Sequence, residues 1–291
     1  MKDDIYNNYN LVVNELIKIN DSQSCFIIDD KIYYYMNCNY NLDQIKQKMI
    51  IADFLKDRLG IDSLKIIFTK SNEIINNKNM ILLSGNYLAT NREIDIVDIE
   101  KYGVLKVYNN KVNDWSKKWV ATIENIEKKL SQTLIDDEDV LLIINYYVGL
   151  GENAIYLFHK HFSNGHNYTP SHSIIMDNYY SITNPLNYLW DYEQRDYAEY
   201  IKFTIMNDTF NVKDVEYIMK IKKWNIDDVG IFYSRILFFD DFFKDLNAYL
   251  NTKNVDIKKY LQIANIFEQS IKEISELLLK EYNVIFPFAN D

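Results

Sequence analysis

The sequence predicts an α+β chain in two parts, a small N-terminal part of hairpins and helices and a larger, mainly helical part. Both strong β-hairpin signals fall within residues 1–88. Helical periodicity dominates from residue 115 onward. Glycine and proline are scarce, at seven and three of 291 residues, which favours long helices with few tight turns. We therefore predict domains at 1–88 and 89–291, with GNYLATNRE at 85–93 as the linker.

The N-terminal part begins with a helix and a hairpin. Apolar residues recur at a loose helical spacing within 4–19, which predicts an amphipathic helix there. Residues alternate between apolar and polar on both sides of Asp29-Asp30, and these two residues are typical of a turn. The pattern predicts a hairpin over 26–37.

A second helix and a second hairpin follow. Between residues 42 and 59 apolar side chains recur every three or four positions, and Gly60 stands where a C-terminal cap belongs. Two short apolar runs, 64–69 and 80–85, are separated by a polar segment and predict the second hairpin. The order is thus helix, hairpin, helix, hairpin.

The larger part is predicted to be built from helices. A stripe that begins at Trp115 and Trp119 repeats at helical spacing, and residues 140–150 are apolar nearly all round, which predicts a buried helix. Further helices are predicted near 195–207, 212–224, 226–251 and 256–282. We interpret the aspartates among them as helix N-caps and solvated faces rather than as a metal site, namely Asp227, Asp228, Asp240, Asp241 and Asp245.

Charge and composition exclude several classes of partner. The net charge of −10 and the pI near 5.0 oppose binding to nucleic acid or anionic lipid, because a phosphate backbone requires a basic surface. The sequence contains no run of about 18 apolar residues, so we predict no membrane span. The first residues, MKDDIYNNYN, are acidic and polar, unlike a secretory signal. We expect a product that is cytoplasmic when it is made.

Tyrosine and cysteine usage each leave two interpretations. The 24 tyrosines suit a tyrosine-rich surface that packs against protein partners, or they reflect an AT-rich genome. Cys25 and Cys38 flank the first hairpin, and we expect buried free thiols, with a cross-strand disulfide as the alternative.

The central stretch 146–200 holds all four histidines and is where a site is expected, since loops between regular elements carry most chemistry. It is predicted to run helix, loop, two short strands over 173–182, loop, helix. His159 and His161 are two positions apart, so on a helix they point to different faces, which weakens a zinc site. We expect no metal, with His159 capping the helix and His161 exposed.

Three segments carry a resemblance to a known family: IYNNYNL at 5–11, YYVGLGENAIYLFH at 146–159 and PLNYLWDYEQRDYAEYIK at 185–202. The chain resembles the spore coat kinase-like proteins, specifically the YutH branch of the CotS group, which is related to the aminoglycoside and choline phosphotransferases. The resemblance implies a bilobal protein-kinase-like fold, which the order of predicted elements also suggests. It further implies synthesis in the mother cell of a spore-forming bacterium, a place in the spore coat, and other coat proteins as partners.

A kinase of this type needs a loop Asp to orient the acceptor hydroxyl, an Asn and a second Asp to hold Mg²⁺, and a strand Lys for the phosphates. When the loop at 165–175 is aligned on Pro170, Asn167 takes the place of the loop Asp and His172 that of the metal-binding Asn. Alignment on His166 gives Tyr168 and Ser173 instead. Neither alignment supplies a carboxylate.

Two further parts of the kinase machinery are missing by the same comparison. Asn184, followed by Pro185, takes the place of the second metal-binding Asp. Residues 21–40 contain no glycine, so the small part has no glycine-rich loop. Met36 or Asn37 stands near the position of the phosphate-pairing lysine, while Lys31 lies back in the turn. The chain therefore reads as a pseudokinase.

One element of the scaffold is retained. Asp196 matches the Asp that braces the catalytic loop in this superfamily, so it would brace residues 165–168. The alternative makes Asp191 and Asp196 ordinary helix-start residues beside Arg195.

Our main functional hypothesis is a catalytically degenerate spore coat protein with a structural or scaffolding role. No cofactor is expected. The first alternative is an atypical phosphotransferase of the aminoglycoside or choline kinase type, which would use ATP and Mg²⁺ through Asn167 and His172. The second is a non-catalytic module that binds a small molecule or a nucleotide.

Overall fold

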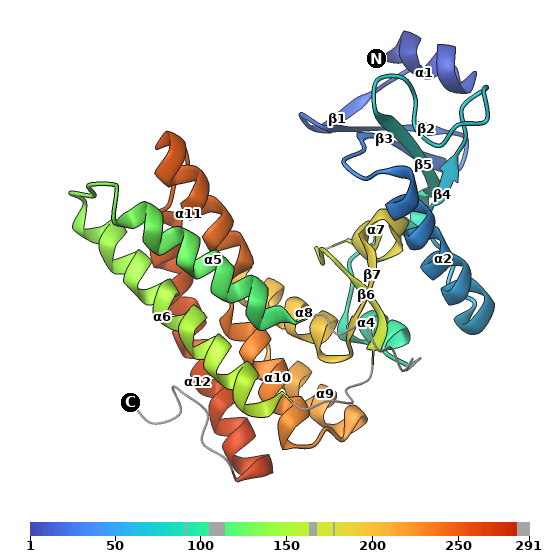
Figure 1. Cartoon of the computed structure of the whole chain (residues 1–291). Helices are drawn as coiled ribbons and strands as arrows, with labels where there is room; N and C mark the ends of the chain where they lie inside the picture. The colour runs from blue at the N-terminus through green and yellow to red at the C-terminus, as the bar shows by residue number, and fades with distance from the viewer. Residues whose placement is uncertain (91, 105–113, 163–167, 177, 284–291) are drawn as a thin grey trace. The chain divides into compact units, whose positions relative to one another are not determined.

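The computed structural model describes residues 1–90, 92–104, 114–162, 168–176 and 178–283 (Figure 1). The chain divides into two compact units. Unit 1 comprises Met1–Leu105 and Pro170–Trp190, and unit 2 comprises Lys106–Thr169 and Asp191–Asp291. The predicted lobe boundary between residues 88 and 89 remains a prediction, because these two units do not define the lobes of a kinase-like fold.

Unit 1 is built on a five-stranded antiparallel sheet with the strand order β1-β2-β3-β5-β4. Both predicted hairpins are confirmed. In the first, Ile28 pairs with Lys31, and Asp29 adopts a left-handed conformation with φ 52° that a tight turn requires. The strands are β1 (Ile17–Asn20), β2 (Gln23–Ile28), β3 (Lys31–Asn37), β4 (Lys65–Ile67) and β5 (Met80–Asn86).

The helix predicted at 42–59 is α2 (Leu42–Leu59). It begins at a capping box, in which Asn41 accepts from the backbone of Gln44 and the Gln44 side chain accepts from the backbone of Asn41. It ends at Gly60, whose φ of 67° is a left-handed conformation that glycine adopts at no steric cost.

The two faces of this sheet are covered by different segments. One face packs against α2 and forms an apolar cluster that is centred on Cys25, Ile32, Tyr34, Ile45, Leu64, Ile81, Leu83 and Leu186. The other face packs against α1 (Lys2–Tyr9) through Ile5, Tyr9, Phe26, Tyr35 and Leu82. Cys25 and Cys38 are buried free thiols, as predicted.

The rest of unit 1 consists of short elements. Asp98, in α4 (Ile96–Tyr102), is buried, and its carboxylate accepts hydrogen bonds from both Nη atoms of Arg92 at 2.7 Å and from Lys101 Nζ at 2.8 Å. Burial alone would raise the pKa of Asp98, but Arg92 and Lys101 outweigh it and hold that pKa at about 2. The elements are α3 (Tyr87–Thr90), α4 (Ile96–Tyr102), α7 (Tyr179–Thr183) and the 3₁₀ helix η1 (Pro185–Asn187). A separate two-stranded sheet is formed by β6 (Tyr168–His172) and β7 (Tyr188–Tyr192).

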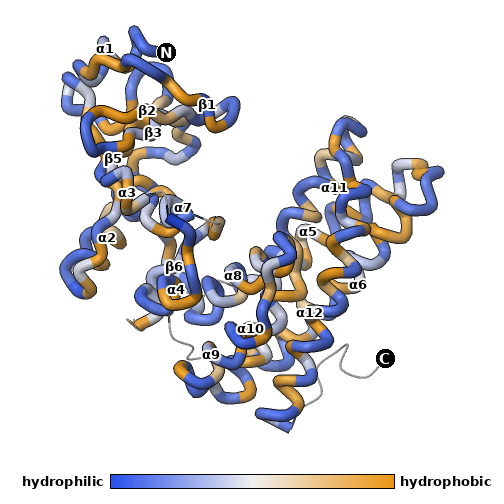
Figure 2. The backbone as a smooth tube through the Cα atoms, turned by 180° about the vertical axis from the view of Figure 1, so that it is seen from behind, coloured by the Kyte–Doolittle hydropathy of each residue, from blue (hydrophilic) through white to orange (hydrophobic). Residues whose placement is uncertain are grey.

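Unit 2 is mainly helical. Its helix α6 packs against α5 and α10, and α12 packs against α8 and α9. Hydrophobic and hydrophilic stretches alternate along these helices, as expected when one side of each is buried (Figure 2). The helices are α5 (Trp115–Leu130), α6 (Glu138–His161), α8 (Gln194–Met206), α9 (Val212–Lys222), α10 (Ile226–Leu237), α11 (Asp240–Thr252) and α12 (Lys259–Tyr282).

Helix α6 is the one helix of the described residues that is long and apolar enough to cross a membrane, by length and composition alone. Its buried side chains include Ile143, Tyr147 and Phe158, which lie inside unit 2. A core helix of a folded domain passes the same test, and the prediction of a buried helix at 140–150 agrees with this packing.

Three sequence-based expectations on secondary structure are wrong. The predicted helix at 4–19 ends at Tyr9, because Asn10 adopts a left-handed cap with φ 59°, and Ile17 instead begins β1. The strands predicted over 173–182 are replaced by α7, and the partner of β6 is β7. The helix predicted at 226–251 is two helices, because the chain breaks at Phe238 and Phe239 and buries both rings.

The expectation of a tyrosine-rich surface is also wrong. Of the tyrosines that the structure describes, only Tyr6 and Tyr156 are classed as exposed, at 49% and 61%. Many others form the core, where Tyr147 stacks on Phe242 and Tyr102 donates to the carbonyl of Ile182 at 2.8 Å. Tyrosine here supplies buried apolar area together with a hydroxyl that finds a partner.

Candidate functional site

The candidate site is the face of the five-stranded sheet that carries α2. Tyr34 and Met36 of β3 are both packed on this face. Within β3 the only basic residue is Lys31, which is exposed at the first position of the strand. Burial raises the pKa of Tyr34 to about 12, so this side chain stays uncharged at neutral pH. On this face the strand thus presents an aromatic ring and a thioether, and the correspondence of this position with the phosphate-pairing lysine of a kinase remains a prediction.

This face is covered by Tyr180, which belongs to α7. The Tyr180 ring centroid lies 4.1 Å from that of Tyr34. The Tyr180 hydroxyl accepts from Gln23 Nε2 at 2.8 Å and from Asn184 Nδ2 at 3.0 Å, and it donates to Met36 Sδ at 3.6 Å. Burial raises the pKa of Tyr180. We call this set of five residues the Tyr180 plug.

The sequence positions the plug through short local structure. Asn184 is the C-terminal cap of α7, and its side-chain Oδ1 accepts a hydrogen bond from the backbone N–H of Leu186 as η1 begins. Pro185 occupies the first position of η1, where a missing N–H costs nothing. Leu186 then packs into the same apolar cluster as Tyr34. Asn184, through its hydrogen bond to the Tyr180 hydroxyl, and Leu186, through the shared apolar cluster, therefore anchor Tyr180 against the sheet.

The turn between β1 and β2 is short and acidic. Strand β1 ends at Asn20 and β2 begins at Gln23, so two residues connect them. Asn20 Oδ1 accepts from the backbone N–H of Ser22 at 2.9 Å, and Asp21 pairs with Lys18 at 2.6 Å. A phosphate-binding loop offers several backbone N–H groups and glycines for close approach. This turn offers a carboxylate instead.

Lys48 of α2 is a partly buried cation with uncharged partners. Its Nζ donates to the carbonyl oxygen of Tyr188 at 2.9 Å and lies 4.5 Å from the centroid of the Tyr40 ring. Burial lowers the pKa of Lys48 to about 8. This lysine comes from the helix rather than from β3, and it holds α2 to the start of β7.

In unit 2, Asp191 near the end of β7 is a buried carboxylate whose oxygens are occupied. One oxygen accepts from Trp115 Nε1 at 3.0 Å and from the backbone N–H of Tyr192 at 2.9 Å. The other accepts from Arg195 at 2.9 Å. With three donors and one counter-charge already in place, this carboxylate is bound within its own unit.

A second buried charge network lies close to it in unit 2. Glu199 pairs with Arg235 at 2.5 Å and with Lys202 at 2.9 Å. Arg235 also pairs with Asp240 at 2.9 Å and lies 5.0 Å from the ring centroid of Trp115. Burial alone would raise the pKa of Glu199, but Arg235 and Lys202 outweigh it and hold that pKa well below its usual range.

Two of the three described histidines are buried among other side chains. His161 is buried rather than exposed, which corrects our expectation, and its Nδ1 lies 3.2 Å from Asp227 Oδ1. His159 is the exposed one of the pair. His172 is fully buried, hydrogen-bonds the carbonyl of Ile182 at 3.0 Å and meets the Tyr102 ring edge-on at 4.5 Å. In the part of the chain that the structure describes, no three His, Cys, Asp or Glu side chains gather to hold a metal ion.

The residues predicted to replace the catalytic ones are not all described. Asn167 and His166 lie outside the described residues, as does most of the loop that Asp196 is predicted to brace. Asp196 itself is buried in the first turn of α8, so the brace remains a prediction. His172 and Asn184 both belong to unit 1, where one contacts Tyr102 and the other belongs to the Tyr180 plug.

Two features of the site were missed by sequence reasoning. The sequence pattern places Tyr180 in a predicted strand, whereas its role comes from long-range contacts, above all with Tyr34. The alternative interpretation of Asp191 as a helix-start residue is wrong, because Asp191 lies in β7, four residues before Arg195. The motif WDYEQR could have signalled the second point, because Asp and Arg are placed i, i+4 on either side of the strand end.

Comparison with solved structures shows the fold. A spectinomycin phosphotransferase, APH(9)-Ia, in complex with ADP and spectinomycin has a TM-score of 0.60 at 13% identity, with 92% of each chain covered. An aminoglycoside phosphotransferase from Alicyclobacillus acidocaldarius has 0.59 at 7%, with 94% of each covered. A choline/ethanolamine kinase family protein from Mesorhizobium loti has 0.52 at 9%, covering 91% of this chain and 92% of its own. The fold is that of the kinase-like phosphotransferases, as predicted.

The family follows from the sequence. The model described as "Spore coat putative kinase YutH" matches residues 2–278, and this chain belongs to that family. No curated protein matches it by sequence. The predicted α+β, protein-kinase-like fold and the predicted family are both confirmed.

Proposed function

We propose that this member of the spore coat YutH family is a pseudokinase with a structural or scaffolding role in the spore coat. The observation that carries the proposal is the Tyr180 plug: the sheet face that carries α2 is filled by the chain's own aromatic side chain. A phosphoryl-transfer site needs a lysine on this sheet and space for phosphates. Tyr34, Met36 and Tyr180 supply neither.

Two further observations support the same proposal. The two residues of the β1–β2 turn, Asp21 and Ser22, include no glycine that would let a phosphate approach the backbone closely. Asp191 is already bound by Arg195 and Trp115, so recruiting it to Mg²⁺ would require breaking an ion pair and a buried hydrogen bond. Because likeness of fold does not transfer activity, the proposal rests on these side chains and not on the phosphotransferases the chain resembles.

The alternative of an atypical phosphotransferase has less support. It would need Asn167 and His172 as substitutes for catalytic residues. His172 is fully buried between Tyr102 and the carbonyl of Ile182, which leaves it poorly placed to hold a metal ion. The second alternative, a module that binds a nucleotide without turnover, would also require Tyr180 to move.

The proposal is tested in the sporulating host. A strain whose chromosomal copy carries Asn167→Ala, which removes a residue that the phosphotransferase alternative requires, should form spores with the same profile of extractable coat proteins as the parent strain, whereas a deletion strain should not. If Asn167→Ala, at wild-type protein level, reproduced the deletion phenotype, a chemical role for this residue would replace the scaffold. A thermal-shift titration of the purified protein with ATP and Mg²⁺ is expected to leave the melting temperature unchanged.

A further inference from the structure

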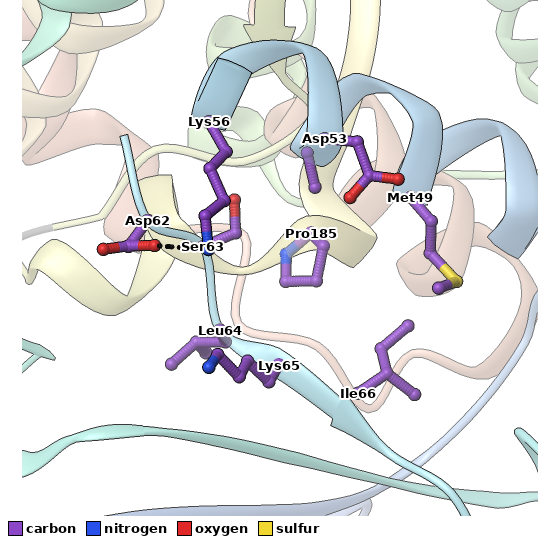
Figure 3. Close-up of a pocket in the computed structure, with 10 residues that line it drawn as sticks. Met49, Asp53, Lys56, Asp62, Ser63, Leu64, Lys65, Ile66 and Pro185 are labelled. Atoms are coloured by element: carbon purple, nitrogen blue, oxygen red, sulfur yellow. Dashed lines mark ion pairs between the residues drawn. The ribbon is translucent and has the colours of Figure 1, made fainter. Parts of the chain in front are cut away.

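A cavity of about 290 Å³ opens in unit 1 between α2 and β4 (Figure 3). Its floor is apolar and includes Pro185, which lies between the helix and the strand. Its rim carries charged side chains from both elements. The lining residues are Met49, Ala52, Asp53, Lys56, Asp62, Ser63, Leu64, Lys65, Ile66 and Pro185. The volume is at the lower end of the roughly 300–1,000 Å³ typical of small-molecule pockets, which suits an aliphatic side chain more than a nucleotide.

Strand β4 beside the cavity is an edge strand. It is last in the order β1-β2-β3-β5-β4, and in the part of the chain described here it pairs with β5 alone. The N–H of Leu64, just before β4, donates to the carbonyl of Thr183 at 2.9 Å and so points away from β5. Backbone groups alternate in direction along a strand, so the N–H and C=O of Ile66 point to the same outer edge. An edge of this kind is a template for an added strand.

Only some of the charged side chains at the rim form an ion pair. Lys56 and Asp62 pair with each other at 3.4 Å, and the pair is exposed. Asp53 on α2 and Lys65 on β4 enter no ion pair among the described residues. One carboxylate therefore remains on the helix side of the cavity and one ammonium group on the strand side (Figure 3).

We propose that this groove docks an extended segment of another protein, which adds to β4 as a sixth strand. An aliphatic side chain of the segment fills the cavity. The next residue, on the opposite face of the strand and beside Lys65, is acidic. The residue two positions away from the aliphatic one faces α2 and is basic, opposite Asp53. Backbone hydrogen bonds to Ile66 supply affinity and the cavity supplies selectivity, as in strand addition generally.

The inference does not depend on catalytic silence, because none of the groove residues belongs to the Tyr180 plug. It also explains a local feature of the sheet. A Cβ at Gly85 would lie 2.2 Å from Leu64 Cδ2, so glycine at this position lets Leu64 sit deep in the sheet and leaves the space above it open as cavity floor.

The test uses the full chain and a set of short fluorescein-labelled peptides, Ser-Thr-Xaa-Glu-Lys-Thr-Ser with Ile, Leu or Val at Xaa, with scrambled versions as the reference. Fluorescence anisotropy should show that at least one patterned peptide binds and that the scrambled ones do not. Ala52→Trp fills the cavity and should abolish binding. No binding by any patterned peptide, or binding unchanged by Ala52→Trp, would overturn the proposal.

Two pairs of variants test the edge and the charge separately. Ile66→Pro removes the outward N–H, which an edge strand tolerates, and should weaken binding more than Ile66→Ala, which keeps it. Asp53→Lys should weaken binding roughly threefold to fivefold, as expected for one exposed ion pair, and a peptide with Glu in place of Lys should restore it. Asp57→Lys, on the same helix but outside the cavity, should change nothing.

Unfolding curves by circular dichroism establish that each variant is folded. In the amide NMR spectrum, the peptide should shift and protect the Ile66 resonance. Shifts confined to residues outside α2 and β4 would contradict the assignment. Sedimentation of the protein without peptide distinguishes a second copy of this chain as the occupant, because self-association that is lost in Ala52→Trp would replace the peptide proposal.

Discussion

Replacing Lys48 by methionine should stabilise the protein, although it removes a hydrogen bond and a cation–π contact. A lysine whose pKa falls from 10.5 to about 8 opposes folding while it is charged. At 1.36 kcal/mol for each pH unit, the cost at neutral pH would reach about 3 kcal/mol. Because Lys48 is only partly buried, solvent reduces this to about 1–2 kcal/mol. Methionine keeps the apolar stem and leaves no charge to desolvate.

The lowered pKa of Lys48 also fixes how the stability of the protein changes with pH. The unfolded state binds the proton of Lys48 more tightly than the folded state, so the stability of the wild-type protein rises as pH increases from about 8 towards 10.5. The advantage of Lys48→Met should therefore be full at pH 7 and at most about half as large at pH 9.5.

The assay is urea unfolding of both proteins at these two pH values, with Lys46→Met as the control. Lys46 is exposed on the same helix, so its replacement should change the unfolding free energy little. A Lys48→Met protein that is less stable than the wild type at pH 7, or a gain that is the same at both pH values, would refute the reasoning. The hydrogen bond to Tyr188 would then outweigh the cost of burial.

Three further predictions concern the packing of each unit. Glu199→Gln leaves Lys202 and Arg235 buried beside a neutral group, and chemical denaturation should show that the free energy of unfolding falls by about 3 kcal/mol. A decrease below about 1 kcal/mol would mean that the network contributes no more than exposed ion pairs do. Gly230→Ala brings a Cβ to 2.2 Å from His161 Cγ and should lower the free energy of unfolding by at least about 2 kcal/mol. In the matched helical change Gly149→Ala, the added Cβ meets no atom within 4 Å, so this variant should be more stable by about 0.5–1 kcal/mol. An equal response of the two variants would contradict the packing of α6 on α10. Asp98→Asn removes a carboxylate whose pKa in the folded state is about 2. Thermal melts should show that the wild type is the more stable protein above pH 4 and that it loses this advantage as the pH falls towards 2. An advantage that persists at pH 2 would exclude the Arg92–Asp98 pair as its source.

The parts of the fold that local sequence determines were predictable. The turn at Asp29-Asp30 and the cap at Gly60 are both carried by residue types that adopt left-handed conformations, and both mark the boundaries of real elements. Leu42–Leu59 follows from helical periodicity, and the buried helix around 140–150 follows from a segment that is apolar nearly all round. The family resemblance added the prediction that these elements belong to a protein-kinase-like fold.

The parts that tertiary contacts determine were not predictable. Ile17 sits within a helical pattern but pairs with Cys25 as an edge strand, because the sheet offers it a partner. Phe238 interrupts a helical pattern since its ring stacks on Trp119 at 4.6 Å. Tyr180 lies 146 residues from Tyr34 in the sequence, and neither residue reveals the other. The candidate site depends on this last contact.

The measurement that tests the central claim most directly is calorimetric titration of ATP with Mg²⁺ into the wild-type protein, beside Tyr180→Phe. If the chain's own tyrosine fills the sheet face, the wild-type protein and Tyr180→Phe will show no heat of binding, because phenylalanine keeps the ring. Tight, saturable binding of ATP to the wild-type protein with Tyr180 in place would contradict the account.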